Sequence, residues 1–100
     1  MAASTSTDDI FRLLSEFKQQ RGSEYDLKSL GVFGSVARGE ADAESDVDVV
    51  FETDRPNLFR TSSLRQELQG LLNRPVDVVR LRTRMNPTLR ASIEREARYV

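Results

Sequence analysis

Two aspartates that follow a Gly-Ser pair are the residues of this sequence best suited to chemistry. Ten residues separate Gly34-Ser35 from Asp46, and Asp46 and Asp48 open the apolar run Val47-Asp48-Val49-Val50-Phe51, which is typical of a β-strand. Because side chains alternate across a strand, the two carboxylates are expected on one face. Neighbouring carboxylates repel each other unless a cation or a shared proton neutralises them. The pair therefore indicates a divalent metal, and the Gly-Ser turn indicates a phosphate for that metal to act on.

The residue types missing from the sequence narrow the choice of metal. There is no cysteine and no histidine, so thiolate and imidazole ligands are unavailable. Any cation must be held by oxygen atoms, which favours Mg²⁺, with Mn²⁺ as the other candidate. A general base must likewise be a carboxylate or a metal-activated hydroxyl.

The elements that must position these residues form one small domain. Hydrophobic periodicity predicts helices over residues 8–20, 35–38, 57–72 and 86 to about 99, and strands over residues 27–33, 46–52 and 75–81. Residues 1–7 are expected to be a disordered tail and residues 8–100 a single domain. The order α-β-α-β-α-β-α predicts an α/β (α+β) fold, a small mixed sheet with covering helices.

Several residues mark the ends and the buried faces of the predicted helices. Thr7 or Asp8 is expected to cap the first helix and Gly22 to end it. The Asn86-Pro87 pair is a typical start for the last helix. The buried stripe of the 57–72 helix is predicted to contain Leu64, Leu68, Leu71 and Leu72.

The connections predict the direction of each strand. Strands 46–52 and 75–81 are joined by a helix, so they should be parallel with a right-handed crossover. Gly34-Ser35 ends the first strand whereas Asp46 opens the second, so these two strands must be antiparallel for both to reach one site. Asp77 lies near the start of the third strand. Three aspartates are therefore expected at one edge of the sheet.

Composition and charge limit the classes of function. The chain is 38% hydrophobic and 31% charged, and no apolar run approaches the roughly 18 residues of a membrane helix. No secretory signal is visible, and we expect a cytoplasmic protein. Residues 1–54 carry a net charge of −7 and residues 55–100 one of +6. The basic half, with its row Arg80, Arg82 and Arg84, either faces an anionic substrate or acidic partner or is a solvated edge.

The constellation as a whole resembles a known family. Gly34-Ser35, the Asp46-x-Asp48 pair and Asp77 in a valine-rich strand resemble the nucleotidyltransferase superfamily related to DNA polymerase beta. The short length, the run Gly34-Ser35-Val36-Ala37-Arg38-Gly39 and the closing run Ile93-Glu94-Arg95-Glu96-Ala97 are similar to the minimal nucleotidyltransferases of the MntA antitoxin type. The resemblance covers residues 8–100 and implies a polymerase beta-like palm fold.

This resemblance implies an activity, a cofactor and a partner. The implied reaction transfers AMP from ATP to an acceptor with release of pyrophosphate, and the implied acceptor is a tyrosine of a partner HEPN-domain toxin. Two Mg²⁺ or Mn²⁺ ions would accompany the nucleotide. No direct nucleic-acid binding is expected, and a homo-oligomer is compatible with the sequence. The implied catalytic and metal-binding residues are Asp46, Asp48 and Asp77, and the implied nucleotide- or phosphate-binding residues are Gly34, Ser35, Arg38 and Ser45.

Most of these residues also have a structural alternative that the sequence leaves open. The alternatives are ion pairs of Asp77 with Arg74 or Arg80 and of Arg38 with Glu40 or Asp42, a helix cap for Ser35 and a plain loop position for Ser45. The alternative for the whole protein is a non-catalytic antitoxin or subunit that neutralises its partner by binding alone. Pure binding does not require three clustered acids, although the arginine row is compatible with it.

Overall fold

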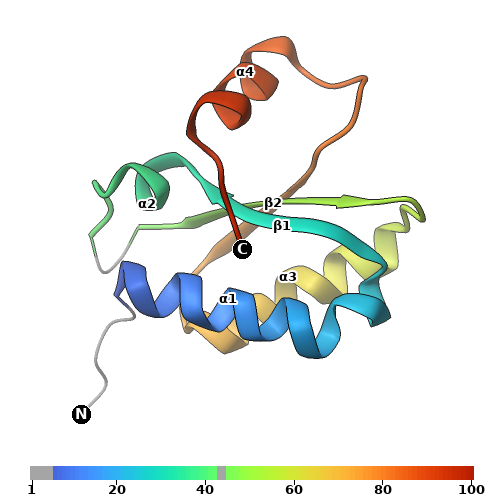
Figure 1. The fold of residues 1–100 in the computed structure, drawn as a ribbon, viewed down its shortest axis with the longest axis horizontal. Helices are drawn as coiled ribbons and strands as arrows, with labels where there is room; N and C mark the ends of the chain where they lie inside the picture. Colours follow the sequence, from blue (N-terminus) through green and yellow to red (C-terminus); the bar gives the residue numbers. More distant parts are fainter. Residues whose placement is uncertain (1–5, 43–44) are drawn as a thin grey trace.

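In a computed structural model, which describes residues 6–42 and 45–100, helices lie on both faces of a four-stranded sheet (Figure 1). In chain order the elements are α1 (Thr7–Arg21), a 3₁₀ helix (Gly22–Tyr25), β1 (Leu27–Phe33), α2 (Gly34–Arg38), β2 (Val47–Thr53), α3 (Leu58–Leu72), β3 (Val76–Arg80), α4 (Pro87–Glu96) and β4 (Arg98–Tyr99). The predicted α/β fold class and the order of the first three strands are confirmed, and β4 is an additional strand. Residues 1–5 of the predicted tail lie outside the described residues.

The strand order β3-β2-β1-β4 places the parallel pair at one side of the sheet. β1 runs antiparallel to β2, and β2 runs parallel to β3 after the α3 crossover, as predicted. In this register Phe33, the last residue of β1, faces Asp48, and Asp48 faces Asp77. The end of β1 therefore meets the starts of β2 and β3.

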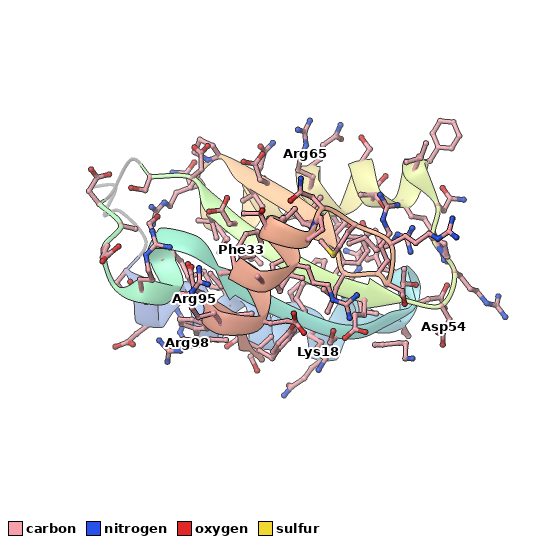
Figure 2. The ribbon with its side chains drawn as sticks, turned by 90° about the horizontal axis from the view of Figure 1, so that it is seen from above. Lys18, Phe33, Asp54, Arg65, Arg95 and Arg98 are labelled. Atoms are coloured by element: carbon pink, nitrogen blue, oxygen red, sulfur yellow. The ribbon has the colours of Figure 1, made fainter. Side chains whose placement is uncertain are left out.

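The two faces of the sheet are covered unequally (Figure 1). α1 and α3 lie on one face, where their side chains and those of the sheet form the main core, with Ile10, Leu14, Val32, Val49, Leu64 and Leu68 fully buried. α4 lies on the other face, where Phe33, Val50 and Ile93 form a small cluster, and Figure 2 shows Phe33 beneath α4. No helix among residues 6–42 and 45–100 is long and apolar enough to cross a membrane.

The ends of α1 differ from the prediction. Ser6, rather than Thr7 or Asp8, caps the helix, because its hydroxyl oxygen accepts a hydrogen bond from the Asp9 backbone N–H at 3.2 Å. Thr7 is the first helical residue, so residues 6 and 7 do not belong to a tail. Gly22 keeps a right-handed conformation, since the chain continues into the 3₁₀ helix and reverses only at Asp26, where φ is +51°.

The starts of α3 and α4 follow their sequence signals. The Asn57 side chain accepts from two backbone N–H groups of the first turn of α3, and Asn86 does the same for α4, with Pro87 as its first residue. The predicted stripe of α3 is correct at Leu64, Leu68 and Leu72, but Leu71 is 37% exposed. At 3.6 residues per turn Leu71 lies at the margin of the stripe, close in direction to Leu64 but roughly 100° around the helix from Leu72.

The predicted helix to about Tyr99 is wrong at its end, because α4 stops at Glu96 and the chain pairs with β1. Gly31 of β1 permits this pairing: a Cβ atom there would lie 2.8 Å from Tyr99 Cδ1 and 2.9 Å from the Arg98 carbonyl oxygen. The Val100 N–H donates to the Leu30 carbonyl oxygen at 2.9 Å, and the Arg98 guanidinium lies 4.4 Å from the centre of the Phe11 ring. The last residues therefore close the sheet as an edge strand.

Candidate functional site

The turn after β1 brings the backbone against a carboxylate. Gly34 has φ of +75°, in the left-handed region that L side chains rarely adopt. A Cβ atom at this position would lie 2.3 Å from Asp48 Oδ2, closer than two such atoms can approach. The sharp turn and the close approach both require glycine here. The Gly34 backbone consequently lies directly against the Asp48 side chain.

The strand register brings the predicted aspartates to one edge of the sheet. Asp48 and Asp77 are direct partners on the parallel strands β2 and β3, so their side chains leave the same face of the sheet, on strands about 4.8 Å apart. Asp46 directly precedes β2. Asp48 is half-buried, whereas Asp46 and Asp77 are exposed. One shielded carboxylate therefore stands between two that face solvent.

The surroundings of Asp48 oppose its negative charge. Burial raises the pKa of Asp48 above its ordinary value, and the charges of Asp77 and Asp46 raise it further, while Arg38 acts in the opposite direction. A cation or a positively charged group at this place would relieve the repulsion. Clustered acids with a raised pKa in a cleft or at a sheet edge are typical of functional sites.

These oxygen donors suit a hard divalent cation that is shared with a phosphate. No group of three acidic side chains in the described part of the chain lies close enough to hold a metal ion by itself. Mg²⁺ in phosphate-transferring sites is usually held by one or two carboxylates, with phosphate oxygens and water completing its octahedron. Three aspartates at one edge of the sheet fit that mode of binding. They do not fit a site in which protein atoms supply every metal ligand.

The structure places Ser35 and Arg38 in the short helix α2, which follows the turn. Phe33 occupies the N-cap position and no side chain caps the helix, so the alternative of a cap for Ser35 is wrong. Arg38 Nε donates to Glu40 Oε1 at 2.7 Å, which confirms the alternative of an ion pair with Glu40. Arg38 Nη1 also donates to both carboxylate oxygens of Glu96, at 2.6 and 3.0 Å. Arg38 is thus held between two acids beside Asp48.

The loop that leads into Asp46 is anchored by Arg74, a residue whose role the sequence did not reveal. Arg74 is buried, and its Nη2 donates to the carbonyl oxygens of Asp42 at 2.7 Å and Ser45 at 2.6 Å. The Ser45 hydroxyl donates to Asp42 Oδ1 and accepts from the Asp42 N–H, both at 3.1 Å. Ser45 therefore stabilises the loop. No ion pair of Asp77 with Arg80 is found within the described ranges.

The mixed sheet, the glycine turn and the carboxylates on neighbouring strands define an α/β protein with acidic side chains gathered at one edge of its sheet. Comparison with known proteins makes the assignment specific. The model of the nucleotidyltransferase domain family matches residues 12–100, so this chain belongs to that family and is a nucleotidyltransferase.

Individual relatives are similar over nearly their whole length. A Methanocaldococcus jannaschii protein assigned as a protein adenylyltransferase is 34% identical over 92% of this chain and 95% of its own. The protein adenylyltransferase MntA of Thermococcus cleftensis is 30% identical over 98% of this chain and 99% of its own. A solved structure assigned as a minimal nucleotidyltransferase has a TM-score of 0.79 and 32% identity, and the match covers 96% and 97% of the two chains.

The fold is also shared with a chain of a larger assembly. A complex of a tri-AMPylated HEPN toxin of Shewanella oneidensis with an MNT antitoxin contains a chain that matches with a TM-score of 0.63. The identity is 20%, and the match covers 87% of this chain and 66% of that chain. At this identity the likeness concerns the fold alone.

Proposed function

We propose that this nucleotidyltransferase transfers AMP from ATP to a tyrosine hydroxyl of a partner protein, a HEPN-type toxin, and acts in the cytoplasm as its antitoxin. The names of its relatives as protein adenylyltransferases support the reaction, and the fold of the antitoxin complex supports the kind of partner. The observation that carries the proposal is the contact between the Gly34 backbone and Asp48, with Asp77 beside it on the next strand.

The proposed reaction begins with the triphosphate of ATP at the Gly34-Ser35 turn. The acceptor oxygen attacks the α-phosphorus, a new oxygen–phosphorus bond forms, and the bond from the α-phosphorus to the oxygen that bridges to the β-phosphate breaks. Pyrophosphate leaves with that oxygen. Asp77 accepts the hydroxyl proton, since the sequence has no histidine for this role. The product is an AMP ester of the acceptor.

The cation in this proposal is Mg²⁺, or Mn²⁺ in its place, with two ions per bound nucleotide. Asp46, Asp48 and Asp77 are the residues that would hold it. When bound, such ions neutralise phosphate charge and align the attacking and leaving oxygens. Ser35 would donate to a phosphate oxygen, and Arg38 would do so once it leaves one of its acidic partners.

Mass spectrometry tests the reaction directly. The chain is incubated with ATP and Mg²⁺ together with the protein encoded beside its gene, and Asp46→Asn/Asp48→Asn serves as the inactive control. We expect one or more AMP additions on the partner, located on tyrosine by fragmentation, and none with the double variant. A tight complex that gains no mass with any of the four nucleoside triphosphates would contradict the proposal and favour neutralisation by contact.

The contact-only alternative has its own test. Asp48→Asn removes one carboxylate charge from the site and changes the side-chain volume little. Under the proposed function this variant fails to neutralise the partner although it still binds it. If Asp48→Asn neutralises the partner as well as the wild type does, binding alone is the function.

A further inference from the structure

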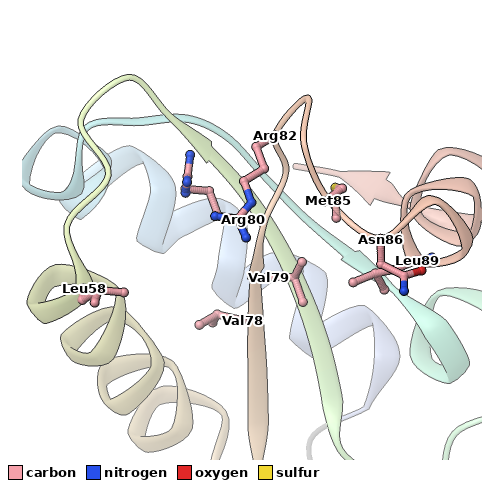
Figure 3. Close-up of a pocket in the computed structure, with 8 residues that line it drawn as sticks. All are labelled: Leu58, Val78, Val79, Arg80, Arg82, Met85, Asn86 and Leu89. Carbon is pink, nitrogen blue, oxygen red and sulfur yellow. Dashed lines mark hydrogen bonds between the residues drawn. The ribbon is translucent and has the colours of Figure 1, made fainter.

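An apolar groove follows the outer edge of β3, on the side of the strand away from β2. It encloses about 390 Å³ and is lined by apolar side chains from α3, β3 and the segment that leads into α4, which are Leu58, Val78, Val79, Met85 and Leu89. Figure 3 shows Val78 and Val79 pointing to opposite faces of the strand, with Leu58 beyond Val78 and Leu89 beyond Val79. We call this hollow the β3 groove.

Apolar surface extends from the groove onto the start of α3. Leu58 is 87% exposed and Phe59, the next residue, is 85% exposed, and both are far more exposed than any other large apolar side chain in the described ranges. Exposed apolar groups beside an apolar hollow are typical of surfaces that bind another protein.

Positively charged side chains lie beside the groove. Arg80 and Arg82 line it, and neither they nor Arg84 form an ion pair with any residue that the structure describes. Carboxylates pair with Arg12, Arg21, Arg38, Arg60 and Arg90, whereas Arg55, Arg65 and Arg95 resemble the groove arginines in forming no ion pair with a described residue. The groove therefore combines an apolar floor with positive charge that its own surroundings do not neutralise, which suits an occupant with acidic and apolar side chains.

β3 is also an edge strand. It pairs with β2 on one side, and no described strand pairs with its other side. An edge strand offers backbone N–H and C=O groups to an added polypeptide segment. A small molecule or a nucleic acid does not use a row of backbone N–H and C=O groups together with an apolar groove. The combination therefore favours a protein.

We infer that the β3 groove is the docking site for the acceptor protein, which it recognises by a segment that carries apolar and acidic side chains. This inference rests on the proposed function. Asp77 lies on the same strand, two residues before Val79 and on the same face. A partner segment seated along β3 therefore brings its neighbouring hydroxyl to the carboxylates.

Variants of the groove separate docking from catalysis. Arg80→Glu/Arg82→Glu reverses the charge beside the groove, and Leu58→Glu places a charge on its apolar rim at an exposed position where no core contact is lost. Arg12→Glu/Lys28→Glu reverses the same number of charges at two exposed positions that neither line the groove nor belong to the site. Circular dichroism confirms that each variant is folded.

Binding is measured by calorimetry between the full chain and the protein encoded beside its gene, without nucleotide. We expect each groove variant to bind at least roughly tenfold more weakly than the wild type, because acidic groups of the partner would meet glutamate. The control variant should bind as the wild type does. The affinity for a non-hydrolysable ATP analogue should be the same in all variants.

Four results decide the inference. Unchanged partner binding in both groove variants overturns it, and so does a loss of affinity for the ATP analogue alone, which would make the groove part of the nucleotide site. If light scattering shows that the wild type self-associates and the groove variants do not, the occupant is a second copy and the inference is wrong. If the groove variants lose the partner while the wild type transfers no AMP to it, the proposed function fails and the docking site stands.

Discussion

The two faces of the sheet differ in the side chains that they carry: one holds the main core and the other the proposed site. The face toward α1 and α3 holds the main core, in which aliphatic and aromatic side chains are fully or almost fully buried. The face toward α4 has only a small cluster of buried apolar residues in the part of the chain that the structure describes, and it carries Asp48 and Asp77 at its edge. A large core on one face can stabilise the fold while the other face holds charges that repel each other. Variants of the core should therefore change mainly the free energy of unfolding, and variants of the face toward α4 mainly AMP transfer.

The largest effect is expected at Asp48. Asp48→Asn should lower AMP transfer by roughly 10³-fold, about 4 kcal/mol of transition-state stabilisation, because the proposed metal site loses a charge. The same change should raise Tm by about 2–5 °C, because it removes a half-buried charge that Asp77 and Asp46 repel. Single-turnover transfer and thermal unfolding measure the two quantities. An Asp48→Asn protein that is less stable than the wild type at pH 7 would contradict this account.

The gain in stability should depend on pH in one direction. In the folded protein the pKa of Asp48 is raised, so between its ordinary value and the raised value the folded state binds more protons than the unfolded state. The Asp48 contribution to the free energy of unfolding therefore decreases as pH rises through this interval. The advantage of Asp48→Asn should be smallest near pH 4, grow upward from there and then level off. Urea unfolding of both proteins from pH 4 to pH 8 checks the trend.

The next largest effect is expected on the face of the sheet toward α1 and α3, which holds the main core. Leu68 is fully buried, and Leu68→Ala should lower the free energy of unfolding by about 3 kcal/mol, since it removes buried methyl groups and leaves a cavity. AMP transfer per folded molecule at 20 °C should stay close to that of the wild type. Urea unfolding and transfer assays give both values. A loss of transfer greater than the unfolded fraction explains would show that the two faces are coupled.

The sequence predicted the strands and the shared face of the aspartates because alternation along strands is a local property. β1 spans the predicted residues, and β2 and β3 differ from their predicted ranges by one residue at each end. β4 was missed because two exposed residues carry no periodicity. Its one signal was Gly31, since a glycine inside a strand often marks a close approach of another backbone segment.

The positions of the candidate carboxylates were equally accessible from the sequence, because spacing and strand direction fix a register. The polar contacts around them were not. Arg38 meets Glu96 across 58 residues of chain, and Arg74 meets the loop carbonyls across 29 and 32 residues. Long polar side chains form these hydrogen bonds only after the fold has brought distant segments together. No local sequence pattern therefore predicts them.

A smaller effect on stability is expected at the Gly34 turn, which joins β1 to α2. Gly34→Ala should lower the free energy of unfolding by about 1–2 kcal/mol from the left-handed backbone alone. The added Cβ should also displace the Asp48 carboxylate and lower AMP transfer by roughly tenfold. Gly39→Ala is the matched control, because Gly39 has φ of +74° and nothing within 4 Å of an added Cβ. Equal losses of transfer in both variants would show that strain, and not the contact with Asp48, causes the effect.

The smallest effect is expected from Glu96, whose side chain is 12% exposed and binds Arg38 with both oxygens. Arg38 must leave one of its acidic partners if it is to reach a phosphate. Glu96→Gln should therefore weaken the ion pair between Glu96 and Arg38 and lower KM for ATP by roughly two- to threefold. The value of kcat should change little, since the chemistry does not involve Glu96. Glu40→Gln removes the more exposed partner and should shift KM in the same direction by less. An increase in KM for Glu96→Gln would instead mean that Glu96 positions Arg38 for the phosphate, which would make this ion pair part of the proposed nucleotide site.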